Sequence, residues 1–229
     1  MKKRGIAIDG PAGAGKSTIV KIVASKLKIN SVDSGSLYRT IAYCLKENGI
    51  SIEDVLEMPD EELKGTLNAM KIEPKFEESG QVNYLNGDPV EDKLLRTEEI
   101  SMNASKVSQN GLVREKVTEI CQSLAKSEDV VMEGRDIGTV VMPNALLKVY
   151  LDADPEERAK RRILQLKEKG QKAPSLDEMI EDIKKRDNQD MTREISPLKK
   201  ADDAMTLDST SLTIEEVCKF IVDEYKNRA

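Results

Sequence analysis

Eight residues near the amino terminus have the types and spacing needed to hold a nucleotide phosphate. Residues 10–17 read Gly-Pro-Ala-Gly-Ala-Gly-Lys-Ser and match the pattern G-x-x-x-x-G-K-[ST]. The glycines allow backbone turns that a Cβ would forbid, so that successive N–H groups can point at one anion. Lys16 would then reach the β- and γ-phosphates, and Ser17 would offer its hydroxyl to Mg²⁺.

The residues on both sides of this loop decide between a phosphate site and an ordinary glycine-rich turn. The apolar run of residues 5–8 leads into the glycines, and residues 17–24 continue at helical spacing. A strand, a loop and a helix in this order are the context that the motif requires. Nucleotide binding is therefore the leading hypothesis.

Composition limits the chemistry that is available. The chain has 229 residues, a net charge of −6 and no histidine. Triads with histidine and histidine-ligated metals are therefore excluded, and catalysis must rest on carboxylates, Lys, Arg and Mg²⁺. The negative charge argues against a broad nucleic-acid surface, so any anionic ligand must meet a local basic cluster.

The sequence also indicates a cytoplasmic protein without membrane contact. Cys44, Cys121 and Cys218 are far apart and odd in number, which favours free thiols in a reducing compartment. No apolar run approaches membrane-spanning length, and Met1–Arg4 leads into a run too short for a signal-peptide core.

Short apolar runs that alternate with helical patterns must position the loop. They occupy residues 5–8, 29–33, 130–132, 146–151 and 204–207, and residues 37–48 form a helical pattern ended by Gly49. This alternation predicts an α/β fold, with a five-stranded parallel sheet covered by helices on both faces.

One segment breaks the alternation. Residues 71–76 and 81–85, the Asn86-Gly87 turn and residues 89–90 predict a small antiparallel meander inserted into the α/β body. A turn-rich loop without strands is the alternative.

Residues 155–193 are strongly charged and predict a helical hairpin. Arg158, Arg161 and Arg162 fall on one helical face, and Gly170 and Pro174 interrupt the pattern before a second helix near Ser175. Such a hairpin could be a mobile lid that supplies arginines to a transferring phosphoryl group, or it could be a solvated helix pair.

Three further blocks, at residues 33–39 (DSGSLYR), 133–139 (EGRDIGT) and 186–193 (RDNQDMTR), resemble the bacterial cytidylate (CMP) kinases of the nucleoside monophosphate kinase group. The likeness covers nearly the whole chain. It implies a single P-loop kinase domain, 1–229, with a core (1–33, 110–153, 194–229), a monophosphate-binding region (34–109, with the insert at about 63–106) and a lid (154–193).

The resemblance also implies a role for individual residues. The acceptor phosphate of CMP would be held by Ser34, Arg39, Arg135 and Arg193. The cytosine edge would be contacted by Ser105, Arg114 and Asp136, and the ribose hydroxyls by Arg186 and Asp190. Taken singly, some of these are ordinary surface ion pairs, such as Arg39 with Glu47 or Arg186 with Asp190.

The reaction implied is the Mg²⁺-dependent transfer of the γ-phosphoryl group of ATP to CMP, and also to dCMP, by a monomer. ATP would be bound by Gly10, Pro11, Ala12, Gly13, Ala14, Gly15, Lys16, Ser17 and Thr18. The catalytic residues would be Lys16, Arg158, Arg162 and Arg193. Mg²⁺ would be held by Ser17 directly and by Asp33 or Glu133 through water.

Three alternatives remain open from the sequence. Another small-molecule P-loop kinase could act on UMP, a deoxynucleotide or a nucleotide-like coenzyme. A GTP-dependent switch is disfavoured because no Asn-Lys-x-Asp or Asp-x-x-Gly element occurs. A purely structural nucleotide-binding protein would leave the acceptor arginines without a purpose.

Overall fold

The computed structural model describes residues 5–168 and 170–229. The basic segment Met1–Arg4 and Lys169 of the expected lid lie outside the described residues. The chain divides into two compact units, Met1–Ile29 with Asp129–Ala229, and Asn30–Glu128. Each unit is described by itself.

The parallel sheet has the five strands that the sequence predicts, in the order β2-β6-β1-β7-β8. The first unit contributes β1 (Ile6–Asp9), β6 (Val130–Gly134), β7 (Leu147–Asp152) and β8 (Met205–Asp208). Strand β1 pairs in parallel with β6 and β7, and β7 pairs in parallel with β8. Every residue of β1 and β6 is buried, as expected for central strands of a sheet flanked by helices.

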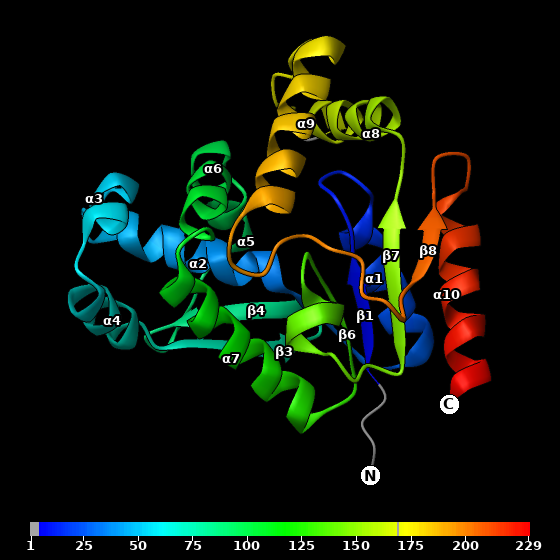
Figure 1. The fold of residues 1–229 in the computed structure, drawn as a ribbon, viewed down its shortest axis with the longest axis horizontal. Coiled ribbons are helices and arrows are strands. Elements are labelled where there is room, and N and C mark those ends of the chain that lie inside the picture. Colours follow the sequence, from blue (N-terminus) through cyan, green and yellow to red (C-terminus); the bar gives the residue numbers. More distant parts are fainter. Residues whose placement is uncertain (1–4, 169) are drawn as a thin grey trace. The chain divides into compact units, whose positions relative to one another are not determined.

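The core of the first unit lies between these strands and two helices, α1 (Lys16–Leu27) and α10 (Ile214–Arg228) (Figure 1). Ile8, Val20, Val149 and Ile221 belong to one buried cluster. This packing holds the strand that leads into the phosphate loop and the helix that follows it.

The charged segment folds as the expected helical hairpin. Helices α8 (Pro155–Glu168) and α9 (Leu176–Thr192) pack side by side around a small core of Ala159, Met179 and Ile183 (Figure 1). Ser175 and Glu178 form a capping box, which explains why the second helix begins there. A π-helical turn, η1 (Ile137–Val141), follows β6 in the same unit.

The second unit contains β2 (Asn30–Asp33), several helices and a small antiparallel sheet. The helices are α2 (Ser34–Glu47), α3 (Ile52–Glu57), α4 (Asp60–Ala69), α5 (Asp92–Leu95), α6 (Glu98–Val107) and α7 (Gly111–Ser127). The sheet is formed by β3 (Ile72–Glu77), β4 (Gly80–Leu85) and β5 (Asp88–Pro89), so the predicted meander is confirmed.

Two local features of the second unit follow directly from residue type. Asn86 and Gly87 both have positive φ, 54° and 99°, as a two-residue hairpin turn requires. Helix α2 begins at Ser34, whereas the periodicity predicted a start at Leu37, because the Asp33 side chain accepts a hydrogen bond from Ser36 N–H and caps the first turn.

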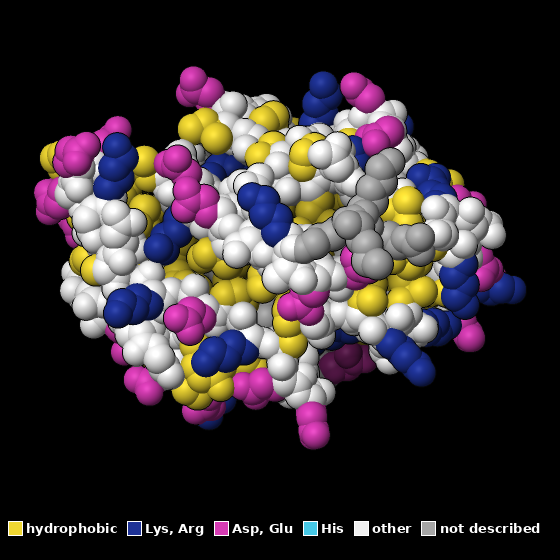
Figure 2. Space-filling model, turned by 90° about the horizontal axis from the view of Figure 1, so that it is seen from below, with side chains coloured by type: hydrophobic (Ala, Val, Ile, Leu, Met, Phe, Trp, Pro, Cys, Tyr) yellow, Lys and Arg dark blue, Asp and Glu magenta, His cyan; other side chains and the backbone are white. Residues whose placement is uncertain are grey.

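Two further features concern the charge of the surface and the length of the helices. On the face shown in Figure 2, basic and acidic side chains are interspersed rather than gathered in one patch. Within the described part of the chain, no helix is long and apolar enough to cross a membrane.

Candidate active site

The phosphate loop follows β1 and requires glycine at its first position. Gly10 has φ 152°, and a Cβ there would lie 2.0 Å from the carbonyl oxygen of Leu151. Gly15 ends the loop with φ 88° and serves as the N-cap of α1, which has no side-chain cap hydrogen bond. The loop therefore presents backbone N–H groups at the positive end of a helix dipole, as an anion site requires.

Lys16 lies inside this loop and is nearly buried, with 6% of its surface exposed. Its Nζ donates hydrogen bonds to the carbonyl oxygens of Gly10 and Pro11, both at 2.7 Å. Burial and the nearby positive charge of Arg135 lower the pKa of Lys16 to about 7, against the opposing effect of Glu133 and other carboxylates. A bound phosphate would supply the negative charge that favours the ammonium form.

Ser17 and Glu133 form the set of oxygen atoms most suited to a hard cation. Ser17 Oγ donates to Glu133 Oε2 at 2.9 Å, and Glu133 is buried near the end of β6. A hydroxyl and a carboxylate fit Mg²⁺, which takes few protein ligands when substrate phosphates supply the others. The described residues contain no group of three or more His, Cys, Asp or Glu side chains arranged to hold a metal.

Asp9, which sequence reasoning missed, anchors the segment after β6. Its carboxylate accepts hydrogen bonds from the N–H groups of Ile137 (2.8 Å) and Gly138 (2.7 Å). Burial raises the pKa of Asp9 to about 6, although the two N–H groups act in the opposite direction. The available signal was an acidic residue at the end of a buried strand, directly before Gly10.

Four predicted CMP-binding residues come together in the first unit. Asp190 Oδ2 accepts from Arg135 Nε at 2.7 Å, and Asp190 Oδ1 accepts from Arg193 Nη1 at 3.3 Å. Arg193 Nη2 lies 3.9 Å from Asp136 Oδ1. Burial by itself would raise the pKa of Asp190, but Arg135, Arg186 and Arg193 outweigh burial and lower it. Asp190 is thus a charged centre that organises arginines as well as a candidate for ribose binding.

Two residues of the helical hairpin, Arg158 and Asp187, form a buried ion pair, and both bind the backbone of Ala12 in the phosphate loop. Asp187 Oδ1 accepts from the N–H of Ala12 at 3.0 Å, and Asp187 Oδ2 accepts from Arg158 Nη1 at 2.6 Å. Arg158 also donates to the carbonyl oxygens of Ala12 (2.8 Å) and Ala153 (2.9 Å). Asp187 was not predicted from the sequence, because its partners are distant in the chain.

The three arginines of α8 therefore have different surroundings. Arg158 is buried beside the loop, Arg161 donates to the carbonyl oxygen of Ser209 at 2.6 Å, and Arg162 is exposed. Helical periodicity placed the three arginines on one face. Their different burial and partners follow only from contacts with other parts of the chain.

In the second unit, Asp33 and Arg39 form the start of α2. Asp33 Oδ2 lies 2.7 Å from Arg39 Nη2 and 3.4 Å from Arg96 Nη2. Burial opposes ionisation of Asp33, but the two arginines outweigh burial and lower its pKa. Arg39 Nε is buried without a hydrogen-bond partner among the described residues, which suits a residue whose partner is a ligand. Arg39 pairs with Asp33 rather than with Glu47.

Two of the remaining candidates of the second unit, Arg114 and Ser105, lie near Ser108. Arg114 is buried, donates from Nη1 to the carbonyl oxygen of Ser108 at 3.1 Å, and lies 5.5 Å from the ring centroid of Tyr38. The carbonyl oxygen of Ser105 accepts from Ser108 Oγ at 2.9 Å. Ser34 is buried at the first position of α2.

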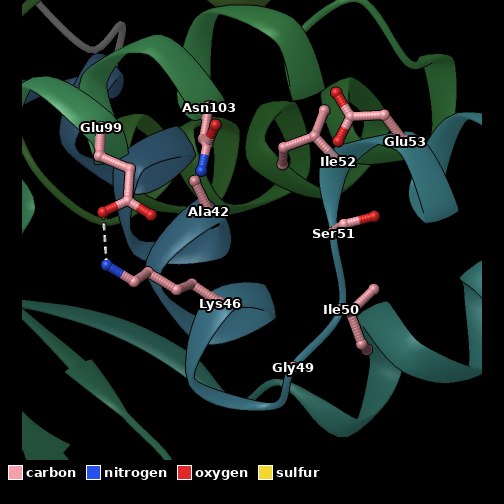
Figure 3. Close-up of a pocket in the computed structure, with 9 residues that line it drawn as sticks. All are labelled: Ala42, Lys46, Gly49, Ile50, Ser51, Ile52, Glu53, Glu99 and Asn103. Atoms are coloured by element: carbon pink, nitrogen blue, oxygen red, sulfur yellow. Dashed lines mark hydrogen bonds and ion pairs between the residues drawn. The ribbon is translucent and has the colours of Figure 1, made fainter.

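A surface pocket of about 290 Å³ in the second unit contains none of these residues. Its walls come from the end of α2, the start of α3 and α6, and Lys46 pairs with Glu99 across it at 2.5 Å (Figure 3). Its three charged residues, Lys46, Glu53 and Glu99, are all exposed. The pocket therefore shares no lining residue with the candidate site.

The fold and the loop together define an α/β protein of the P-loop class. A family model described as cytidylate kinase matches residues 6–227, and the chain belongs to this family.

Individual relatives agree with this placement. The chain is 47% identical to the cytidylate kinase of Caldicellulosiruptor bescii over 97% of this chain and 96% of the relative. It is 46% identical to the cytidylate kinase of Bacillus thuringiensis (strain Al Hakam), over 96% and 95% of the two chains. A solved structure of an uncharacterised protein from Eubacterium ventriosum is similar in fold alone, with a TM-score of 0.51, 14% identity and coverage of 99% and 100%.

Proposed function

We propose that this chain transfers the γ-phosphoryl group of ATP to CMP, giving ADP and CDP, and that it also accepts dCMP. The observation that carries the proposal is the presence of two kinds of phosphate-binding set. One is the backbone loop of residues 10–17, and the other consists of half-buried arginines, Arg39 in one unit and Arg135 and Arg193 in the other. A protein that binds one nucleotide needs only the first set.

The acceptor phosphate is held by side chains in this proposal. Arginine binds phosphate oxygens bidentately, and serine adds a neutral donor. Ser34, Arg39, Arg135 and Arg193 are assigned to the phosphate of CMP, as the family resemblance implies. The phosphate oxygen of CMP is already ionised at neutral pH, so the chain needs no general base, in agreement with its lack of histidine.

The base and the ribose are assigned to the remaining candidates. Ser105, Arg114 and Asp136 would contact the cytosine edge, where an acidic acceptor matches the exocyclic amine. Arg186 and Asp190 would contact the ribose hydroxyls. The ion pair of Asp190 with Arg135 supports a second role for Asp190, namely orienting the arginines for the acceptor phosphate.

The donor side rests on Lys16 and on the arginines of α8. Catalysis in such a transfer consists of holding two polyanions in line and stabilising the charge of the transferring group. Lys16 is assigned to the β- and γ-phosphates. Arg158 is assigned to the transferring group because its guanidinium is already bound beside Ala12. Arg162 is exposed and would require the hairpin to close as a lid.

Mg²⁺ is proposed as the cofactor. When bound, the ion would neutralise part of the charge of the ATP phosphates. Ser17 would hold it directly, and Glu133 would hold it through water. Asp33 was the other candidate, but Arg39 and the N–H of Ser36 already bind its carboxylate oxygens, so Glu133 is preferred.

The wider expectations are also proposals. The chain would act as a monomer on small molecules, without nucleic acid or membrane, and in the cytoplasm, where its three buried free cysteines would stay reduced. The proposed core comprises residues 1–33, 110–153 and 194–229. The proposed monophosphate-binding region comprises residues 34–109, and the proposed lid comprises residues 154–193.

The test is a coupled assay of ADP release with CMP, dCMP, UMP, AMP and GMP as acceptors. We expect CMP and dCMP to stimulate ADP release strongly above the background of ATP hydrolysis. Asp136→Ala should lower the efficiency with CMP far more than it weakens ATP binding. Stimulation by another acceptor but not by CMP would show that the cytidine assignment is wrong, and equal losses for both substrates would remove Asp136 as a base reader.

A further inference from the structure

Two amide side chains of the inserted sheet reach the start of α2. Gln81 Oε1 accepts a hydrogen bond from Asp33 N–H at 2.8 Å, and Gln81 Nε2 donates to Ser36 Oγ at 2.9 Å. Gln81 belongs to β4, and all of these residues lie in the second unit. The sheet thus binds both the residue that caps α2 and the first turn of that helix.

Asn83, two residues after Gln81 in β4, also binds the first turns of α2. Its side chain is almost fully buried, with 3% of its surface exposed. Nδ2 donates to Ser36 Oγ at 3.1 Å and to Thr40 Oγ1 at 2.9 Å, while Oδ1 accepts from Gln81 Nε2 at 2.8 Å. Residues at i and i+2 of a strand share a face, which is why both amides point to the same helix.

The network is polar although an apolar contact would suffice for packing. Burying an amide is favourable only when its hydrogen bonds are satisfied, and apolar residues of similar shape would hold a sheet against a helix equally well. Hydrogen bonds, in contrast, fix one position and orientation of the two elements. Ser36 completes the network by donating from Oγ to the carbonyl oxygen of Asp33 at 2.7 Å.

The segment that is fixed in this way carries the acceptor-phosphate candidates. Ser34 lies between the two bound residues Asp33 and Ser36, and Arg39 lies one turn further along the same helix. Asp33 in turn orients Arg39 through their ion pair at 2.7 Å. A shift of the corner between β2 and α2 would therefore move both phosphate ligands.

We propose that Gln81 and Asn83 are positioning residues for acceptor binding: the inserted sheet holds the β2–α2 corner in the geometry in which Ser34 and Arg39 bind the phosphate of the acceptor. This inference rests on the proposed function. It gives the inserted sheet a specific task, which is to set the affinity for the acceptor rather than for ATP.

The experiment compares Gln81→Met and Asn83→Leu, which keep the bulk of the side chains, with the wild-type chain. Since one buried hydrogen bond contributes about 1 kcal/mol, we expect each variant to raise the KM for CMP about fivefold. The KM for ATP should stay within about twofold, the additivity error of distant sites. The control is Tyr84→Phe, which removes a hydrogen bond to Glu77 from the opposite face of the same strand.

A second measurement tests the network without any substrate. The backbone N–H of Asp33 should exchange with solvent faster in Gln81→Met than in the wild-type chain, because that side chain is its acceptor. Unchanged exchange, or faster exchange with an unchanged KM for CMP, would overturn the inference. So would a wild-type KM for CMP in Asn83→Leu, since packing alone would then explain Asn83.

The wild-type assay separates this inference from the proposed function. If the wild-type chain phosphorylates a different nucleoside monophosphate, the cytidine assignment is wrong, and the KM for that acceptor replaces the KM for CMP. If CMP is the acceptor but the amide variants raise the KM for ATP and for CMP equally, the proposed function stands and the positioning role is wrong.

Discussion

Helices α1 and α2 both follow a short strand, but they begin with residues of different chemistry. Helix α1 begins after Gly15, which has a left-handed backbone and offers no side-chain cap. Helix α2 begins after Asp33, whose carboxylate accepts from the N–H of Ser36. The N–H groups of the first turn of α1 are left available to a phosphate. In α2, by contrast, one N–H group of the first turn is already bound to the negatively charged carboxylate of Asp33.

This difference determines how each region can bind an anion. A carboxylate at a helix start repels a phosphate, so a phosphate near α2 must be bound by side chains that outweigh it. Arg39 pairs with Asp33 and still has a buried Nε without a partner among the described residues, and Arg96 adds a second positive charge. In the proposed function, the donor region would therefore bind through backbone N–H groups and the acceptor region through arginine side chains.

The largest effect is expected at the loop. Lys16→Met should lower kcat by roughly 10²–10³, the loss typical for removal of one donor that stabilises transition-state charge. Lys21→Met, at an exposed position of the same helix, is the control. The measurement is ADP release at saturating CMP, and a loss of less than tenfold would show that backbone N–H groups alone carry the donor region.

The next effect is expected at the acceptor region. Arg39→Ala should raise the KM for CMP roughly 10- to 100-fold, because hydrogen bonds to charged groups contribute about 1.5–3 kcal/mol. Arg39→Lys should recover only part of this, since an ammonium cannot bind bidentately. An equal rise in the KM for ATP would show that the two regions are not separate. Arg96→Ala, which removes only the more distant partner of Asp33, should have a smaller effect.

The pH dependence should also differ between the regions. The pKa of Lys16 is lowered to about 7, so the neutral amine becomes the main form above that pH and must take up a proton to bind ATP. The dissociation constant of the ATP complex should therefore rise about tenfold between pH 6 and pH 8. Calorimetry in buffers of different ionisation enthalpy measures this proton uptake. Lys16→Met should remove the dependence; if it persists, another group titrates.

The smallest effect is expected from the cap of α2. Asp33→Ala should lower the free energy of unfolding by about 1 kcal/mol, the usual contribution of an N-cap. Asp33→Asn keeps a capping oxygen and loses the ion pair with Arg39, so it should be less destabilised. Urea unfolding measures both variants. Equal destabilisation would mean that the ion pair, rather than the cap, stabilises the start of α2.

Local patterns predicted most of the fold. The strand before the loop, the meander with its Asn86-Gly87 turn and the hairpin that restarts at Ser175 are each encoded by residues close together in the chain. The start of α2 was wrong by three residues, because the polar residues from Ser34 to Ser36 lack apolar periodicity and only the cap of Asp33 reveals it.

The candidate site was less predictable from the sequence. The phosphate-loop motif, a local pattern, identified Lys16, whereas Arg39 and Asp190 were assigned only through the family resemblance. Asp9, Asp187, Gln81 and Asn83 were missed. Each acts by binding a backbone group or a side chain far away in sequence, and such pairs have no local signature.

The sequence by itself determined the class of chemistry: a phosphate loop, no histidine and a charged segment with several arginines, all of which depend only on residue type and spacing. Tertiary structure alone decided which charges are buried and which partners they have. It placed Arg158 against the loop and left Arg162 exposed, although both lie on one face of α8. It also lowered the pKa of Lys16, because burial and neighbouring charge depend on segments that meet only in the folded chain.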